Sequence, residues 1–151
     1  MNKKLTKQEL EDAAWFIARN VHLHQKYGKE PYINHVKRVY ESVSSISKDN
    51  NETVKIVAIL HDSVEDSNVS IEEVEKIFGK IIAQAVQAIS RGDGEKYNEY
   101  IKRVSKNKFA KMVKICDLIE NLKHSYLSSE HESLQKRYEK ALFLLATDEM
   151  E

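Results

Sequence analysis

The chain has 151 residues, with 24 Lys and Arg against 24 Asp and Glu, so its formal net charge is zero. Four Gly and one Pro are too few turn-forming residues for a collagen-like, a Pro/Gly-rich disordered or a β-sandwich protein. Zero net charge gives no support for nonspecific binding to nucleic acid or to a membrane surface. A lone cysteine, Cys116, excludes an internal disulfide, and the N-terminal stretch lacks the apolar core of a signal peptide, so we expect a cytoplasmic protein.

Helix start and stop signals recur along the chain. Thr6 with Glu9 forms a capping box, in which side chain and backbone satisfy each other's free groups at a helix start. Ser70 with Glu73 forms a second one, and Pro31 suits the first position of a helix. Together with the apolar periodicity, these signals predict helices over about residues 7–26, 31–47, 51–66, 70–78, 80–89, 97–105, 108–125 and 130–147. The prediction is an all-α fold, a single compact bundle of seven or eight helices over residues 1–151.

The charges cancel in number but are segregated along the sequence. Residues 61–75 hold six carboxylates and no Lys or Arg, whereas residues 100–116 hold six cations and no carboxylate. Solvated helix faces and favourable helix N-termini account for most of these charges. They do not account for carboxylates that directly follow an apolar run.

Such carboxylates follow the apolar residues 54–60, where the sequence continues into His61, Asp62, Glu65 and Asp66. Residues four apart share a helix face, so we expect His61 beside Glu65 and Asp62 beside Asp66. Burying these groups without a partner costs several kcal/mol. The usual remedies are a metal ion, a counter-charge or a hydrogen-bond network.

Two further polar groups occupy comparable positions on other predicted helices. His35 lies in the first turn of the second helix, and Asp117 follows another apolar run, with Asn121 one turn later on the same face. Together with His61 and Asp62 they offer two imidazoles and two carboxylates from three helices. This mixed nitrogen and oxygen donor set suits Mn²⁺, Fe²⁺ or Zn²⁺. A purely structural hydrogen-bond network is the alternative interpretation.

Five motifs occur in order along the chain: Pro31-Tyr32-Ile33 with His35, Leu60-His61-Asp62, Val64-Glu65-Asp66, Phe78-Gly79, and Lys114 to Asp117 with Asn121. Their order resembles that in the HD-domain metal-dependent phosphohydrolases, named for their adjacent His and Asp. The resemblance covers about residues 13–125. Within the family, it is to the branch containing the hydrolase domain of RelA/SpoT alarmone enzymes and the small alarmone hydrolases.

The resemblance implies an HD-type helical fold and a divalent ion, most often Mn²⁺ in the alarmone branch. The implied metal ligands are His35, His61, Asp62 and Asp117. Glu65 and Asp66 match the acidic pair that activates or orients the attacking water, and Asn121 matches a position near the substrate. Lys26, Lys29 and Arg91 are candidate cations for substrate phosphates.

The activity implied is metal-dependent hydrolysis of a small phosphorylated nucleotide, such as removal of the 3′-pyrophosphate of (p)ppGpp. Residues 26–30 lack the Arg-Lys pair that alarmone hydrolases usually carry before Pro-Tyr-Ile. Two alternatives therefore stay open. One is hydrolysis of another small phosphorylated metabolite, such as a nucleoside monophosphate, and the other is nucleotide binding without turnover.

Overall fold

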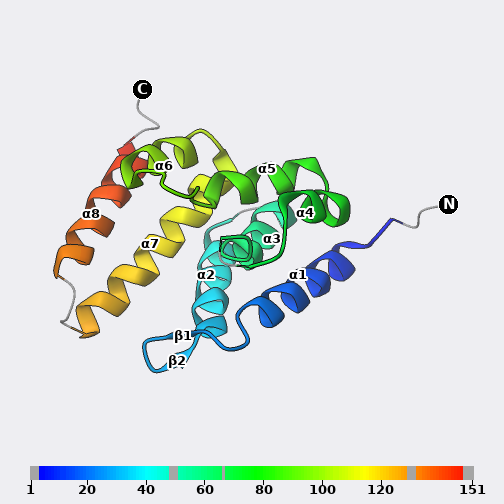
Figure 1. Cartoon of the computed structure of the whole chain (residues 1–151), viewed down its shortest axis with the longest axis horizontal. Coiled ribbons are helices and arrows are strands. Elements are labelled where there is room, and N and C mark those ends of the chain that lie inside the picture. The colour runs from blue at the N-terminus through cyan, green and yellow to red at the C-terminus, as the bar shows by residue number, and fades with distance from the viewer. Residues whose placement is uncertain (1–3, 48–50, 66, 129–131, 148–151) are drawn as a thin grey trace.

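Eight helices and one short hairpin make up the part of the chain that the computed structural model describes, residues 4–47, 51–65, 67–128 and 132–147 (Figure 1). In chain order the elements are α1 (Lys7–Val21), β1 (Lys26–Tyr27), β2 (Glu30–Pro31), α2 (Tyr32–Ile46), α3 (Glu52–Leu60), α4 (Ile71–Phe78), α5 (Lys80–Ile89), α6 (Tyr97–Ser105), α7 (Lys108–Ser128) and α8 (Glu132–Thr147). The helical fold class predicted from the sequence is confirmed. None of these helices is long and apolar enough to cross a membrane.

Both predicted capping boxes are present. The Thr6 hydroxyl accepts from the backbone N–H of Glu9 at 3.1 Å, and the Glu9 carboxylate accepts from the Thr6 N–H at 2.9 Å. Ser70 and Glu73 make the same pair of bonds at the start of α4. Gly79, with φ of 93°, lies between α4 and α5 in a backbone conformation that favours glycine. These local signals fix the helix boundaries that they predict.

The segment between α1 and α2 differs from the prediction. α1 ends at Val21 instead of continuing to about residue 26, and the chain turns into the β1–β2 hairpin, which the sequence did not indicate. Gly28, with φ of 65°, allows the tight turn between the two strands. Pro31 belongs to β2 and precedes the first helical residue of α2 instead of occupying it.

The third predicted helix also ends early, at Leu60 instead of about residue 66. The Ser63 N–H donates to the Leu60 carbonyl at 2.9 Å, an i to i−3 bond that tightens the chain into turns over residues 61–65. The expected stacking of His61 over Glu65 on one α-helix is therefore wrong. Asp66, the predicted partner of Asp62, lies outside the described residues.

α3 is the central element of the core. Its residues Val54 and Ile56–Leu60 are at most 1% exposed, and α3 packs against α1, α2, α5 and α7. α7 lies between α2 and α8, and α8 runs antiparallel to it on its outer side (Figure 1). This packing brings the first turn of α2, the end of α3 and the middle of α7 together.

Candidate metal centre and adjoining pocket

The four predicted metal ligands converge where α2, α3 and α7 meet. Ligand atoms of His35, His61 and Asp62 all lie within 4.8 Å of one another. Asp117 Oδ1 lies 2.8 Å from His35 Nε2 and 3.5 Å from His61 Nε2, and His61 Nε2 lies 3.2 Å from Asp62 Oδ2. Two imidazoles and two carboxylates thus face one another in a small volume, as a mononuclear site requires.

His61 is held in the orientation that a metal ligand needs. It is 1% exposed, and its Nδ1–H donates to the Ala58 carbonyl near the end of α3 at 2.7 Å. This bond fixes the tautomer, so the lone pair is on Nε2. Nε2 is buried and has no hydrogen-bond partner among the described residues. A buried imidazole nitrogen that faces two carboxylates without a hydrogen bond fits a divalent cation.

The pKa shifts of His61 and Asp62 also indicate that the cluster needs positive charge beside its carboxylates. Burial alone would lower the pKa of His61, but the carboxylates of Asp62 and Asp117 raise it well above its ordinary value. Burial would raise the pKa of Asp62, but the charge of His61, whose Nε2 lies 3.2 Å from Asp62 Oδ2, holds that pKa below the usual range. The carboxylates therefore stay ionised and require positive charge beside them. A proton on His61 or a divalent ion can supply that charge.

Asp117 has a second cationic neighbour. Lys114, one helical turn earlier on α7, donates to Asp117 Oδ2 at 3.0 Å, and its side chain is 13% exposed. Burial would raise the pKa of Asp117, but the Lys114 charge and the hydrogen bond with His35 hold it well below the usual range. Asn121 donates to Asp117 Oδ1 at 3.4 Å, and Tyr27 donates to Asn121 at 2.5 Å.

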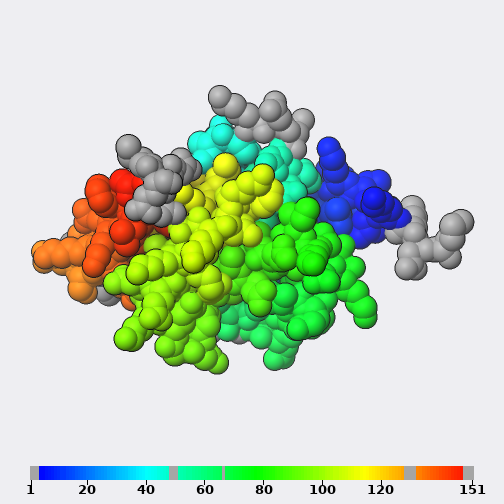
Figure 2. Space-filling view, turned by 90° about the horizontal axis from the view of Figure 1, so that it is seen from above, coloured from blue at the N-terminus to red at the C-terminus, as the bar shows by residue number. Residues whose placement is uncertain are grey.

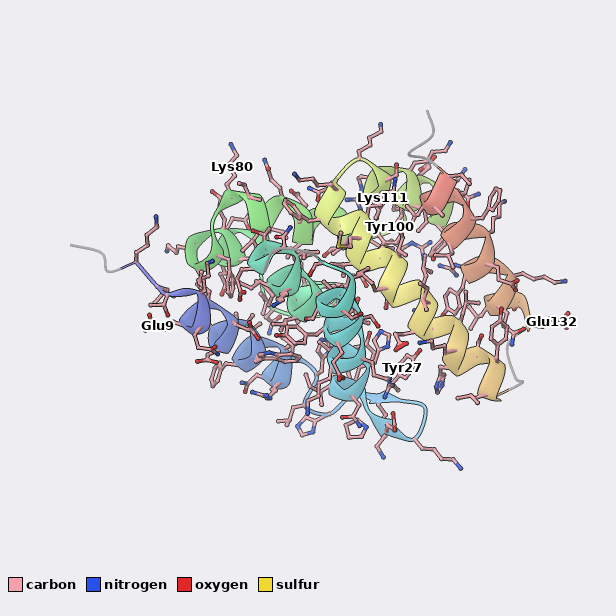
Figure 3. The ribbon with its side chains drawn as sticks, turned by 180° about the vertical axis from the view of Figure 1, so that it is seen from behind. Glu9, Tyr27, Lys80, Tyr100, Lys111 and Glu132 are labelled. Atoms are coloured by element: carbon pink, nitrogen blue, oxygen red, sulfur yellow. The ribbon has the colours of Figure 1, made fainter. Side chains whose placement is uncertain are left out.

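Aromatic side chains that the sequence analysis did not single out surround the ligands. Tyr27 stacks on His35 with ring centroids 4.5 Å apart, and the Tyr32 hydroxyl donates to the Asp62 carboxylate. Tyr100 lies against Lys114, with its ring centroid 5.2 Å from Nζ. Tyr27 and Tyr100 thus contact α7 on either side of Asp117 (Figure 3). A sequence signal existed only for Tyr32, which lies in the Pro-Tyr-Ile motif three residues before His35 on α2.

A pocket of about 220 Å³ opens beside the ligands. It is lined by Tyr32, Asp62, Glu65, Arg91, Tyr97, Tyr100, Lys114, Asp117, Asn121, Arg137 and Tyr138. Glu65, Arg91 and Asn121 are among the predicted catalytic and substrate residues. Arg137 and Tyr138 are additions from α8, and no motif in the sequence marks them, because only the packing of α8 along α7 brings them to the site.

Glu65 stays close to the ligands although α3 ends before it. The backbone N–H of Arg91 donates to Glu65 Oε1 at 2.5 Å. Partial burial of the carboxyl group raises the pKa of Glu65, and the Arg91 N–H opposes that shift. Lys26 and Lys29 are exposed on the hairpin and do not line the pocket. Of the predicted site residues, these two lie apart from the cluster, and Asp66 is not described.

The family assignment follows from a comparison with known protein families. The model of the HD domain matches residues 14–147. The chain is an HD-domain protein. The adjacent His61 and Asp62, with His35 and Asp117 from other helices, carry the resemblance on which the sequence prediction rested, and the family prediction is confirmed.

Similar proteins narrow the branch of the family. This HD domain is 34% identical over 98 residues to the guanosine-3′,5′-bis(diphosphate) 3′-pyrophosphohydrolase MESH1 of Drosophila melanogaster, covering 62% of this chain and 55% of that protein. It is 33% identical over 101 residues to the bifunctional (p)ppGpp synthase/hydrolase SpoT of Escherichia coli, covering 66% of this chain and 14% of SpoT. The matched segment therefore spans about half of MESH1 and a small part of SpoT.

A solved structure shares the fold. It is described as a metazoan ortholog of SpoT that hydrolyses ppGpp, and it matches 94% of this chain and 86% of its own with a TM-score of 0.75. The sequence identity is 24%, so the likeness shows the fold alone. This HD-domain protein is therefore related in sequence to ppGpp hydrolases and shares the fold of one of them.

Proposed function

We propose that this HD domain is a divalent-metal-dependent phosphohydrolase that removes the 3′-pyrophosphate of guanosine 3′,5′-bis(diphosphate). The observation that carries the proposal is the buried cluster of two imidazoles and two carboxylates at the edge of a pocket that also holds Glu65, Arg91 and Arg137. The names of the similar proteins MESH1 and SpoT support this substrate over other phosphate esters.

His35, His61, Asp62 and Asp117 would hold the ion, most often Mn²⁺ in this branch, with Fe²⁺ or Zn²⁺ as alternatives. When bound, such an ion lowers the pKa of water and neutralises charge on a phosphoryl oxygen. The protein's own contribution is to keep the donor set rigid. His61 is fixed by the Ala58 carbonyl, and Asp62 by the Tyr32 hydroxyl.

Glu65 is the proposed general base. Its carboxylate lies in the same pocket as Asp62, and its raised pKa makes it a better proton acceptor than an ordinary glutamate. In the reaction, the oxygen of a water molecule bonds to the phosphorus attached to the 3′-oxygen, and Glu65 takes a proton from that water. The bond between phosphorus and the 3′-oxygen breaks and pyrophosphate leaves. The 3′-oxygen takes a proton from solvent water, and Glu65 releases the proton that it accepted, so that the net change is the addition of one water molecule. Asp66 is proposed to assist Glu65.

The remaining phosphate charge needs cations outside the metal site. Arg91, Lys114 and Arg137 line the pocket, and Asn121 adds an amide. Guanidinium groups bind phosphate through two parallel hydrogen bonds, so the two arginines suit the pyrophosphate group. Lys26 and Lys29, exposed on the hairpin, are proposed to contact the distal part of the substrate only.

One observation favours a second candidate, a smaller phosphorylated metabolite such as a nucleoside monophosphate. The pocket of about 220 Å³ is smaller than the roughly 300–1,000 Å³ that drug-sized ligands usually occupy. A substrate that places only its phosphate and sugar in the pocket would fit this volume.

The test is a turnover assay with Mn²⁺ on guanosine 3′,5′-bis(diphosphate) and on nucleoside monophosphates. We expect pyrophosphate from the first substrate, and a loss of about 10²–10⁴-fold in kcat for Glu65→Gln, because a positioned general base contributes that much. Glu72→Gln, on an exposed position of α4, is the matched control and should keep full activity. Orthophosphate release from monophosphates alone would favour the second candidate, and no release from either would refute the proposal.

A further inference from the structure

Arg103 on α6 uses all five of its N–H groups to bind the segment just before it in the chain. Its Nε and Nη2 donate to the two carboxylate oxygens of Glu95 at 3.0 and 2.9 Å. Nη1 donates to the carbonyls of Gln87 and Ala88, both at 3.0 Å, and Nη2 donates to the carbonyl of Ser90 at 2.8 Å. We refer to this set as the Arg103 clamp. It binds carbonyls in and just after the last turn of α5, where a helix leaves carbonyls without a full set of intrahelical partners.

The clamp also fixes the 90–96 loop, which joins α5 to α6. The Glu95 carboxylate accepts from the Gly92 N–H at 2.9 Å, and the Glu95 carbonyl accepts from Arg91 Nε at 2.9 Å. The hydrogen bonds from Arg103 lower the pKa of Glu95 to about 2, so this arm of the clamp is ionised at neutral pH. In the space-filling view, α6 and the preceding loop lie at the surface between α5 and α8 (Figure 2).

The 90–96 loop is in turn what holds Glu65. The Arg91 N–H at the start of the loop donates to Glu65 Oε1 at 2.5 Å, and the Arg91 guanidinium lies 5.5 Å from the centroid of the Tyr97 ring. Arg91, Glu65 and Tyr97 all line the pocket, whereas Arg103 does not. A continuous set of hydrogen bonds therefore joins Arg103, outside the pocket, to a carboxylate inside it.

We propose that Arg103 is a positioning residue, which orients the Glu65 carboxylate through Glu95 and the Arg91 N–H. The inference rests on the proposed function only in giving Glu65 a role in proton transfer. Lysine cannot replace Arg103 here, because an ammonium offers three donors from one point, whereas the clamp uses five donors spread over a planar fork. Arg103→Lys therefore keeps the positive charge but removes the planar arrangement of five donors.

The first measurement needs neither metal nor substrate. In metal-free protein, Arg103→Lys should raise the exchange rate of the Arg91 amide hydrogen by about tenfold or more, because the loop opens locally. Amides of the buried helix α3 should exchange as in the unchanged chain. Lys106→Gln, which removes an exposed charge three residues along, is the control and should leave the Arg91 amide unchanged. An unchanged Arg91 amide in Arg103→Lys overturns the proposal.

The second measurement separates positioning from general loss of structure. Arg103→Lys should lower kcat about tenfold, and should cost less than about twofold in kcat when added to Glu65→Gln, because residues that act through one another are not additive. Equal losses in both backgrounds would contradict the proposal. If Arg103→Lys does not fold, Glu95→Gln, which weakens the same clamp by removing the charge of the acceptor, takes its place. Absence of turnover in the unchanged chain would refute the proposed function. The exchange rate of the Arg91 amide would still show whether the Arg103 clamp holds the 90–96 loop.

Discussion

Replacing Asp117 by asparagine should lower both the stability of the fold and the affinity for a divalent ion, and the two effects can be measured separately. Asp117 Oδ2 accepts from Lys114 Nζ at 3.0 Å, and Oδ1 lies 2.8 Å from His35 Nε2, with all three side chains at most 13% exposed. Asparagine keeps the shape but removes the charge, which leaves the Lys114 ammonium without its counter-ion. Breaking a buried pair in this way costs about 3–5 kcal/mol. We expect the lower end, because Lys114 retains some contact with water.

The expected changes in melting temperature follow from the length of the chain. Unfolding entropy of about 2.1 cal/mol/K per residue gives roughly 0.3 kcal/mol/K for 151 residues, so 1 kcal/mol corresponds to about 3 °C. Metal-free Asp117→Asn should therefore melt about 9 °C lower. Mn²⁺ at a hundred times its Kd adds about 2.7 kcal/mol to the native state, a rise of about 8 °C for the unchanged chain. The same Mn²⁺ concentration should raise the melting temperature of Asp117→Asn by less than about 2 °C.

Thermal melts followed by circular dichroism, in chelator and in Mn²⁺, measure both quantities. Glu72→Gln is the control, since Glu72 is exposed on α4, and it should melt within about 1 °C of the unchanged chain in either buffer. A full Mn²⁺ shift in Asp117→Asn would show that Asp117 is not a ligand. No shift in the unchanged chain with Mn²⁺, Fe²⁺ or Zn²⁺ would refute the metal site itself.

Three further predictions concern residues around the site. Gly28→Ala should lose about 1–2 kcal/mol of unfolding free energy through its φ of 65° alone. The new Cβ would also lie 2.9 Å from His124 Cε1. Adding His124→Ala should therefore recover only the part of the lost unfolding free energy that comes from this steric contact, as measured by urea titration. Recovery of the whole loss would contradict the argument from the backbone conformation. Cys116 is 2% exposed, and burial raises the pKa of its thiol to about 11. Iodoacetamide at pH 8 should therefore label the native protein at least about tenfold more slowly than the unfolded protein. Mass spectrometry measures the two labelling rates. Glu95 has a pKa of about 2 through Arg103, below its unfolded value of about 4.3, so its stabilisation is complete above pH 4.3 and is lost as pH falls toward 2. Glu95→Gln should then be destabilised by less than about 1 kcal/mol at pH 7, with a difference from the unchanged chain that shrinks with acid; a constant difference from pH 7 to pH 2 would contradict the pKa argument.

Helix boundaries were predictable wherever a local interaction sets them. Thr6 and Ser70 begin their helices through side chains three residues away, and Gly79 ends α4 through its own backbone conformation. The end of α1 was not predictable, because it depends on the hairpin. Tyr27 in that hairpin pairs with Asn121, a residue 94 positions later. No local pattern contains that contact.

The residues of the site also fall into those that the sequence predicted and those that only the packing of the helices reveals. His61, Asp62 and Asp117 stood out because each follows an apolar run that had to be buried, and His35 stood out as a histidine in the first turn of a predicted helix. Arg137, Tyr97, Tyr100 and Tyr138 carry no such contrast with their neighbours, since they face the site only through the packing of α6 and α8. Glu65 stood out as a carboxylate after the same apolar run as His61, but its expected place on α3 was wrong, because a tighter turn follows Leu60.

The wide spacing of the ligands along the chain has a consequence for folding. His35 and Asp117 are 82 residues apart, and the helices that carry them, α2 and α7, pack against each other and against α3. Bringing such distant groups together costs loop-closure entropy that a partly folded chain has not yet recovered. An ion that bridges them would therefore bind after the helices have packed and would act as a reversible cross-link, slowing unfolding more than it speeds folding. Loss of the ion would then be an early event in unfolding, and its release rate would report on the integrity of the whole helical core.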